Sequence, residues 1–192
     1  MLVKHVLMVS GLCAVIAACA SAPDPILYTL ADRSPSEGSL VSEQIIGLSE
    51  LTLPAYARNQ QITTAISPYR VTEDDDHRWA IPPSEALTTA LSNALETSSG
   101  STVLQRPYPA GVRPDIRLSL SFDRLLRGPN GEAEMTGQYL IQSDGRDAEI
   151  SRFSLRVQSS DKSYEAYMAA LSDGLSDLGA EIAAKLDAGP AS

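Results

Sequence analysis

Residues 116–123 read Ile-Arg-Leu-Ser-Leu-Ser-Phe-Asp, and this alternation of apolar and polar side chains decides the fold. Successive side chains of a β-strand point to opposite faces, so the stretch predicts a strand with one buried and one solvated face. The turn formers Gly-Pro-Asn-Gly follow at 128–131, and Asp144-Gly145 marks a second turn. Alternating apolar residues continue between the two turns and again over 153–157. The region therefore predicts a three-stranded antiparallel meander.

Two helices are predicted, one before and one after the meander. Over residues 164–186 apolar side chains recur at the i, i+3, i+4, i+7 spacing of a helix that buries one face. Glycines 174 and 179 inside this stretch cost helix stability and indicate a close approach to a neighbouring element. The same spacing over 85–96 predicts a shorter helix.

Short strand-like runs fill the N-terminal half, at 26–30, 43–53, 62–66, 69–72 and 77–81. The acidic stretch Glu73–Asp76 is interpreted as a turn between two of them. The sum is one α/β domain: a sandwich with a mixed, largely antiparallel sheet and two main helices. A covered sheet face should be apolar, so the polar face of the meander must either be open to water or be covered by a partner.

The N-terminus has the layout of a secretory signal, with Lys4 and His5 before an apolar run over residues 6–17. That run is shorter than the roughly 20 residues that span a bilayer. The following Ile16-Ala17-Ala18-Cys19 resembles the lipobox of bacterial lipoproteins, in which the chain is cut before the Cys and the Cys is acylated. The alternative is a plain signal peptide with a chance Cys.

The lipobox divides the chain into four parts. Residues 1–18 are the expected signal peptide, 19–25 the lipidated Cys with a short tether, 26–188 a single periplasmic domain and 189–192 a flexible tail. The lipid on Cys19 is the one non-protein group expected, and no cofactor is expected. Cys13 leaves with the signal, so no disulfide can form within one mature chain.

The expected mature chain is acidic, with 14 Lys and Arg against 24 Asp and Glu, a net charge of −10. This charge argues against nucleic acid as a partner and against binding to membranes through a basic patch. Signals for catalysis are poor, because His77 is the only His after the signal and no nucleophile or phosphate-loop motif occurs. Asp74–His77 could suggest a cation site, but a solvated acidic turn is far more common. We expect no enzyme and no bound metal.

Arg78-Trp79 is the most distinctive short segment of the expected domain, since it holds the one Trp of the chain. Trp79 is predicted either to belong to the core beneath the first helix or to anchor a partner, because Trp and Arg dominate interface hot spots. Strand alternation sends Arg78 to the opposite side. Arg117, Arg152 and Arg156 are expected on the polar face of the meander, where they would either contact a partner, including a second copy of the chain, or simply be solvated.

Four pieces of sequence, taken in order, resemble PqiC-like lipoproteins, the ABC-type transport auxiliary lipoprotein components. They are Tyr28-Thr29-Leu30, Leu53-Pro54-Ala55-Tyr56, Arg78-Trp79-Ala80 and the 164–183 helix. Ile81-Pro82-Pro83 departs from the family, which more often has Glu-Pro there. With this resemblance we expect Leu53, Pro54 and Trp79 in the core, and Tyr56 among the partner-binding residues with Arg78.

The resemblance implies an α/β/α sandwich akin to anticodon-binding-like domains. It also implies an outer-membrane lipoprotein, facing the periplasm, that serves an MCE-domain protein and an inner-membrane transporter unit in lipid transport and so supports membrane integrity. Ala20 and Ser21 fit outer-membrane sorting. The leading hypothesis is thus a non-catalytic docking subunit. The alternative is a lipoprotein that itself carries an apolar small molecule, which would need an internal cavity.

Overall fold

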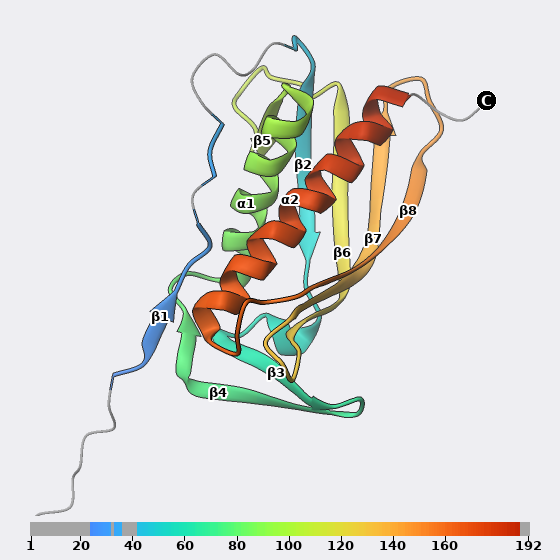
Figure 1. The fold of residues 1–192 in the computed structure, drawn as a ribbon. Coiled ribbons are helices and arrows are strands. Elements are labelled where there is room, and N and C mark those ends of the chain that lie inside the picture. The colour runs from blue at the N-terminus through green and yellow to red at the C-terminus, as the bar shows by residue number, and fades with distance from the viewer. Residues whose placement is uncertain (1–23, 32, 36–41, 189–192) are drawn as a thin grey trace, which may run out of the picture.

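The computed structural model describes residues 24–31, 33–35 and 42–188, and in them eight strands form one mixed sheet with two long helices (Figure 1). The elements in chain order are β1 (Ile26–Tyr28), β2 (Ile45–Thr52), the single turn η1 (Ala55–Ala57), β3 (Gln61–Ser67), β4 (Arg70–Trp79), α1 (Pro83–Ser99), β5 (Thr102–Gln105), β6 (Ile116–Arg127), β7 (Ala133–Ser143), β8 (Glu149–Val157) and α2 (Tyr164–Ala188). The predicted class, an α/β domain with a mixed sheet and two main helices, is confirmed.

The long strand β6 organises the sheet. One edge of β6 pairs with β7 over its whole length, and β7 pairs with β8, which gives the predicted antiparallel meander. The other edge pairs in parallel with β2 along its first half and with β3 at Arg127. The sheet therefore divides into two limbs beyond β6: β2 carries β5, and β3 carries β4 and then β1.

The core lies between the sheet and the two helices. Ile116, Leu118, Leu120 and Phe122 of β6 are buried, as the alternation predicts. The apolar stripe of α2, from Tyr167 to Ile182, packs on this face together with the stripe of α1. Both helices lie on the same side of the sheet (Figure 1). The described chain thus has one helical layer, where the α/β/α order implied by the resemblance would have two, because the apolar stripes of the helices share a single apolar sheet face.

The two helices touch at Gly179. A side-chain carbon added there would lie 2.7 Å from Cβ of Ala94 in α1, closer than carbon atoms pack. Gly174, one and a half turns earlier, faces Met135 and Val157 of the sheet. The glycines that weaken the isolated helix therefore let α2 approach α1 and the sheet at the same time.

The prediction of a turn at Glu73–Asp76 is wrong, because β4 runs through it without interruption. Glu73 and Asp74 pair with Thr63 and Ile62 of β3. The next pair joins Arg78 to Gln61, so residues 75–77 form a bulge that has no opposite residues on β3. A bulge leaves extra residues unpaired and bends the strand, which keeps the acidic side chains at the surface.

The predicted signal peptide, the lipobox with Cys19, and the tail at 189–192 lie outside the described residues. Within the described ranges, neither helix has the length and apolar composition that a membrane crossing requires.

Candidate functional site

The face of the meander that the helices leave open has a buried carboxylate on its middle strand, near the 128–131 turn. Glu134 of β7 is only 9% exposed, and Arg124 and Arg156 contact it from the neighbouring strands. The Arg124 Nε donates to Oε2 over 2.7 Å, and the Arg156 Nη2 lies 2.6 Å from Oε1. One carboxylate between two guanidinium groups leaves a net positive charge on this patch of an acidic protein.

Arg152 and Arg117 extend the same face. Arg152 lies opposite Gln138, which lies opposite Ser121 of β6, so the three side chains form a row across the sheet. Arg152 is exposed and makes no ion pair with any residue that the structure describes. Arg117, at the start of β6, reaches Asp144 of the β7–β8 turn over 3.0 Å and is partly exposed. We call Arg117, Arg124, Glu134, Arg152 and Arg156 the arginine face.

Arg78 and Trp79 point to opposite sides of β4. Trp79 is 4% exposed, and a small gap between it, Leu125 and Tyr167 places it beside β6 and α2. The Arg78 guanidinium turns back to the bulge, where Nε donates to the backbone oxygen of Asp75 over 2.8 Å. The structure therefore places Arg78 away from the arginine face, on the limb that carries β1.

Tyr56, Leu53 and Pro54 lie near the joint between the two limbs. Leu53 is buried, Pro54 is partly buried, and Tyr56 is partly buried against the core. The Tyr56 hydroxyl accepts from the backbone NH of Leu125 over 3.4 Å. The backbone oxygen of Tyr56 accepts a hydrogen bond from the Thr63 hydroxyl. These contacts hold η1 onto β3 and β6, so Tyr56 has a packing role in this fold and does not extend the arginine face.

Side chains far apart in the sequence meet where β1, β4 and α2 come together. The hydroxyl of Tyr28 lies 2.8 Å from Nδ1 of His77, and the His77 ring stacks on Tyr164 with 4.0 Å between centroids. Tyr164 donates to Asp74 over 2.6 Å, and the Arg127 guanidinium sits 4.8 Å from the Tyr164 ring centre. This aromatic cluster fixes strand β1 to the start of α2.

The hydrogen bonds of the cluster shift the pKa of its members. Burial, together with the hydrogen bond to Asp74 and the charge of Asp74, raises the pKa of Tyr164 to about 12. Burial by itself would raise the pKa of Asp74, but the hydrogen bond from Tyr164, the NH of Asp76 and the charge of His77 lower it below its ordinary value. Burial also raises the pKa of Tyr167 in α2. In β7, burial raises the pKa of Tyr139 to about 12.

Replacing Tyr164 by Phe should reduce the sensitivity of the fold to alkali. A phenol whose pKa is raised on folding stabilises the protein below its unfolded pKa near 10, and this contribution is lost as the pH rises towards 12. We therefore expect the free energy of unfolding of the natural protein to fall over that interval, and to fall less steeply in Tyr164→Phe. Urea denaturation at a series of alkaline pH values measures both slopes, and equal slopes would contradict the assignment.

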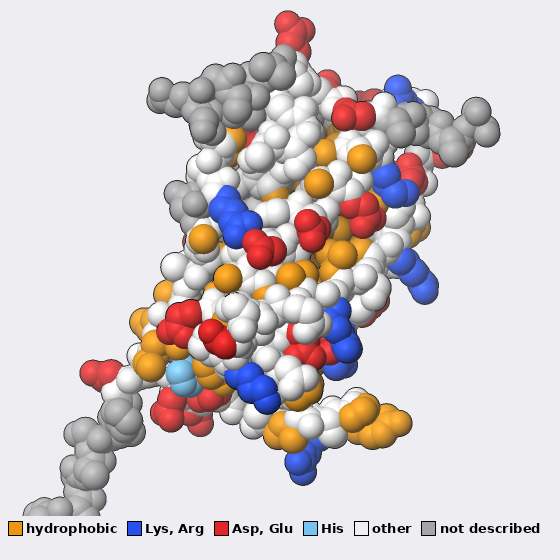
Figure 2. All heavy atoms as spheres, in the orientation of Figure 1, with side chains coloured by type: hydrophobic (Ala, Val, Ile, Leu, Met, Phe, Trp, Pro, Cys, Tyr) orange, Lys and Arg blue, Asp and Glu red, His pale blue; other side chains and the backbone are white. Residues whose placement is uncertain are grey.

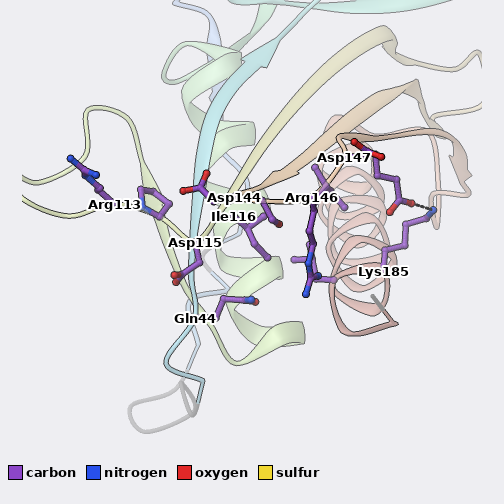
Figure 3. Close-up of a pocket in the computed structure, with 13 residues that line it drawn as sticks. Gln44, Arg113, Asp115, Ile116, Asp144, Arg146, Asp147 and Lys185 are labelled. Atoms are coloured by element: carbon purple, nitrogen blue, oxygen red, sulfur yellow. Dashed lines mark hydrogen bonds and ion pairs between the residues drawn. The ribbon is translucent and has the colours of Figure 1, made fainter. Parts of the chain in front are cut away.

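A pocket of about 400 Å³ opens at the opposite end of the sheet, beside the last turn of α2 (Figure 3). Its charged lining comes from Arg113, Asp115, Asp144, Arg146, Asp147, Glu149 and Lys185. Several of these charges are already paired: Lys185 lies 2.9 Å from Glu149, and Asp144 holds Arg117. A lining of this kind is unsuited to an apolar ligand.

Within the part of the chain that the structure describes, no three His, Cys, Asp or Glu side chains converge on a point where a metal ion could bind. The side chains of the Asp74–His77 stretch have separate partners. Asp74 accepts a hydrogen bond from Tyr164, Asp75 contacts Arg78, and the His77 ring stacks on Tyr164. The Asp74 and Asp75 carboxylates therefore serve other partners.

Sequence reasoning missed Glu134 and the aromatic cluster. Glu134 could have been found, because the turn at 128–131 sets the register that places Glu134 between Arg124 and Arg156. The aromatic cluster had no such signal. Its members sit at positions 28, 77, 127 and 164 and meet only after β1 pairs with β4 and α2 docks.

A family described as "ABC-type transport auxiliary lipoprotein component" matches residues 28–183, nearly all of the described domain. Among solved structures, one described only as an uncharacterized protein aligns with a TM-score of 0.72 at 17% identity, over 85% of this chain and 99% of its own. A Xanthomonas campestris protein of the DUF330 family aligns with a TM-score of 0.65, also at 17% identity, over 85% and 99% of the two chains. These likenesses concern the fold. A search among curated proteins found no match.

Proposed function

Because the chain belongs to the family of ABC-type transport auxiliary lipoprotein components, we propose that it is the non-catalytic docking subunit of a system that moves lipids between membranes. In this proposal, acylated Cys19 holds the domain at the periplasmic face of the outer membrane. The docked partner is an MCE-domain transport protein that an inner-membrane transporter unit serves. Through that traffic the protein supports the integrity of the envelope.

The observation that carries the proposal is the arginine face. It occupies the broad face of the meander that the helices leave open, and its defined residues are four arginines and one glutamate, although the protein as a whole is acidic. Glu134 holds Arg124 and Arg156 in fixed positions, so little side-chain freedom would be lost when a partner binds. A rigid sheet face with fixed arginines suits recognition of a protein surface that carries carboxylates.

The carrier hypothesis has less support. The space between the sheet and the helices is filled by large side chains that are fully buried, among them Leu91, Leu118, Tyr139 and Leu175. The pocket of about 400 Å³ in the described residues is lined by charges and opens to solvent. An apolar ligand would need an apolar cavity, so docking is the better proposal.

Charge reversal at Arg152 tests the docking role. Arg152→Glu removes an unpaired cation and leaves the Arg124–Glu134–Arg156 contacts intact, so the fold should be unchanged. Capture of the transport partner by the membrane-anchored protein, quantified by mass spectrometry, should fall about tenfold or more, equivalent to about 1.4 kcal/mol.

Arg146→Glu is the matched control, because it makes the same charge change at an exposed turn residue that lines the pocket and is not part of the arginine face. It should capture the partner like the natural protein. Equal capture by Arg152→Glu and the natural protein would mean that the arginine face is solvated and does not bind the partner. A change of mass in light scattering, with capture intact, would instead assign the face to contacts between copies of the chain.

A further inference from the structure

Exposed apolar side chains are concentrated on one limb of the sheet. Of the seven large hydrophobic residues that the described part of the chain exposes, six lie on β1, on the β3–β4 hairpin or directly after β4: Ile26, Leu27, Ile66, Tyr69, Val71 and Ile81. Single exposed apolar residues are ordinary on a protein surface, but a set concentrated on one limb of the sheet indicates a contact. Tyr69, at the tip of the hairpin, is fully exposed.

The hairpin projects from the body of the domain. Pro68 and Tyr69 form a tight turn between Ser67 and Arg70, and the limb extends beyond the helical layer (Figure 1). Figure 2 shows the apolar side chains of this tip standing free of the rest of the surface, with basic atoms beside them. Nothing in the described chain covers the tip, and the fold does not need Tyr69 there for packing.

The hairpin lies at the same end of the molecule as the start of β1 (Figure 1). β1 runs parallel to β4, so Ile26, at its start, lies towards the hairpin end of the pair. The proposed lipid anchor, Cys19, precedes Ile26 by a tether of six residues, which span at most about 20 Å. The membrane that holds Cys19 would therefore lie within that distance of the start of β1, at the end of the domain from which the hairpin projects.

The composition of the tip suits the headgroup layer of a bilayer. Tyr is enriched where membrane meets water, because its ring is apolar and its hydroxyl polar. Ile66 and Val71 add apolar area, and Arg70 has a long stem that lets its charge reach phosphates. The limb also carries the acidic stretch Glu73–Asp76, which disfavours an anionic lipid surface.

We propose that the tip of the β3–β4 hairpin, with Ile26 and Leu27 of β1, is a second membrane-contact site that rests in the headgroup layer of a zwitterionic phospholipid surface. This inference rests on the lipid anchor of the proposed function. The two contacts together set the orientation of the domain: β1 and the hairpin face the lipid, and the pocket end with the β7–β8 turn points away from the membrane.

A single fluorescent label tests this orientation. Lipidated full-length protein carrying Ser67→Cys is labelled with a polarity-sensitive dye and reconstituted on phosphatidylcholine–phosphatidylethanolamine vesicles that contain lipids with a headgroup-level quencher. The control carries the label at Ala148→Cys, an exposed residue of the β7–β8 turn at the other end of the domain. We expect blue-shifted, quenched emission at 67 and unshifted, unquenched emission at 148.

A second variant separates hairpin contact from mere proximity. Ser67→Cys combined with Ile66→Thr, Tyr69→Ser and Val71→Thr keeps the strand-forming side chains but removes the apolar surface, so quenching at 67 should fall towards the level at 148. Vesicles rich in phosphatidylglycerol should also weaken the quenching, because they repel the acidic stretch.

The experiment distinguishes failure of the lipid anchor from failure of the second membrane contact. Protein that does not float with the vesicles at all contradicts the anchor at Cys19 and the inference with it. Protein that floats with equal quenching at 67 and 148 contradicts the inference alone. A blue shift at 67 without quenching by lipid would mean that the tip contacts protein, and would also overturn the proposal.

Discussion

Replacing Cys19 by Ser is expected to release the protein from the membrane and to abolish its support of envelope integrity. Stable anchoring of a lipidated protein takes about two membrane signals, each acyl chain contributing about 0.8 kcal/mol per buried CH₂. In the proposed function the lipid on Cys19 is the membrane anchor, because a net charge of −9 disfavours attachment to anionic lipid headgroups. The hairpin tip is too small to hold the domain without it.

Fractionation and complementation measure this effect. Cys19→Ser protein should move to the soluble or unprocessed fraction and fail to complement a deletion, while its folded domain still captures the partner in solution. Cys13→Ser is the matched control, because it makes the same substitution inside the expected signal peptide and should leave anchoring and complementation normal. Flotation of Cys19→Ser with outer membranes, together with full complementation, would contradict the lipobox.

Replacing Trp79 by Ala is expected to lower the free energy of unfolding by about 3–5 kcal/mol, the usual cost of deleting a large buried aromatic side chain. Trp79 is 4% exposed and lies beside Leu125 of β6 and Tyr167 of α2. The backbone NH of Trp79 donates to the backbone oxygen of Gln60, and the backbone NH of Ala80 donates to the backbone oxygen of Tyr28. A cavity here would therefore loosen the attachment of β1 and β3 to β4 as well as the core. Urea denaturation followed by circular dichroism measures the loss.

Arg78→Ala is the control for Trp79→Ala, because it changes the adjacent residue on the opposite side of the strand. The Arg78–Asp75 contact is partly solvated, and contacts of that kind contribute roughly 0–1 kcal/mol. Since the free energy of unfolding of most domains is about 5–15 kcal/mol, Trp79→Ala should remain foldable but clearly weakened. A variant Trp79→Ala as stable as Arg78→Ala would show that the indole contributes no packing.

The meander and the long helix could be predicted because their signals are local. Alternation over β6 and the turn at 128–131 set both the buried face and the pairing with β7. The stripe of α2 likewise identified the side chains that the structure buries, from Tyr167 to Ile182. The short edge strand β5 (Thr102–Gln105) was missed, since four residues carry too little periodicity to be distinguished from a loop.

The prediction of a turn at Glu73–Asp76 was wrong because it rested on the acidic composition of the stretch, whereas pairing with β3 decides its structure. Four adjacent acidic residues are typical of a turn, yet Glu73 and Asp74 keep the register of β3. Their charge is tolerated because the stretch faces solvent at the bulge, and because Tyr164, 90 residues away, donates to the Asp74 carboxylate. No local window contains that donor.

The sequence by itself determined which faces are apolar, where the chain turns in the meander, and that the domain follows an expected lipid attachment site. Only the tertiary structure decided which strands outside the meander lie beside one another, because parallel pairs such as β1–β4 and β2–β5 join segments that are far apart in the sequence. That pairing puts both helices on one sheet face and leaves the arginine face open. It also brings the exposed hairpin tip to the end of the domain where β1 begins, since the direction of β1 is set by its partner β4 and not by its own three residues.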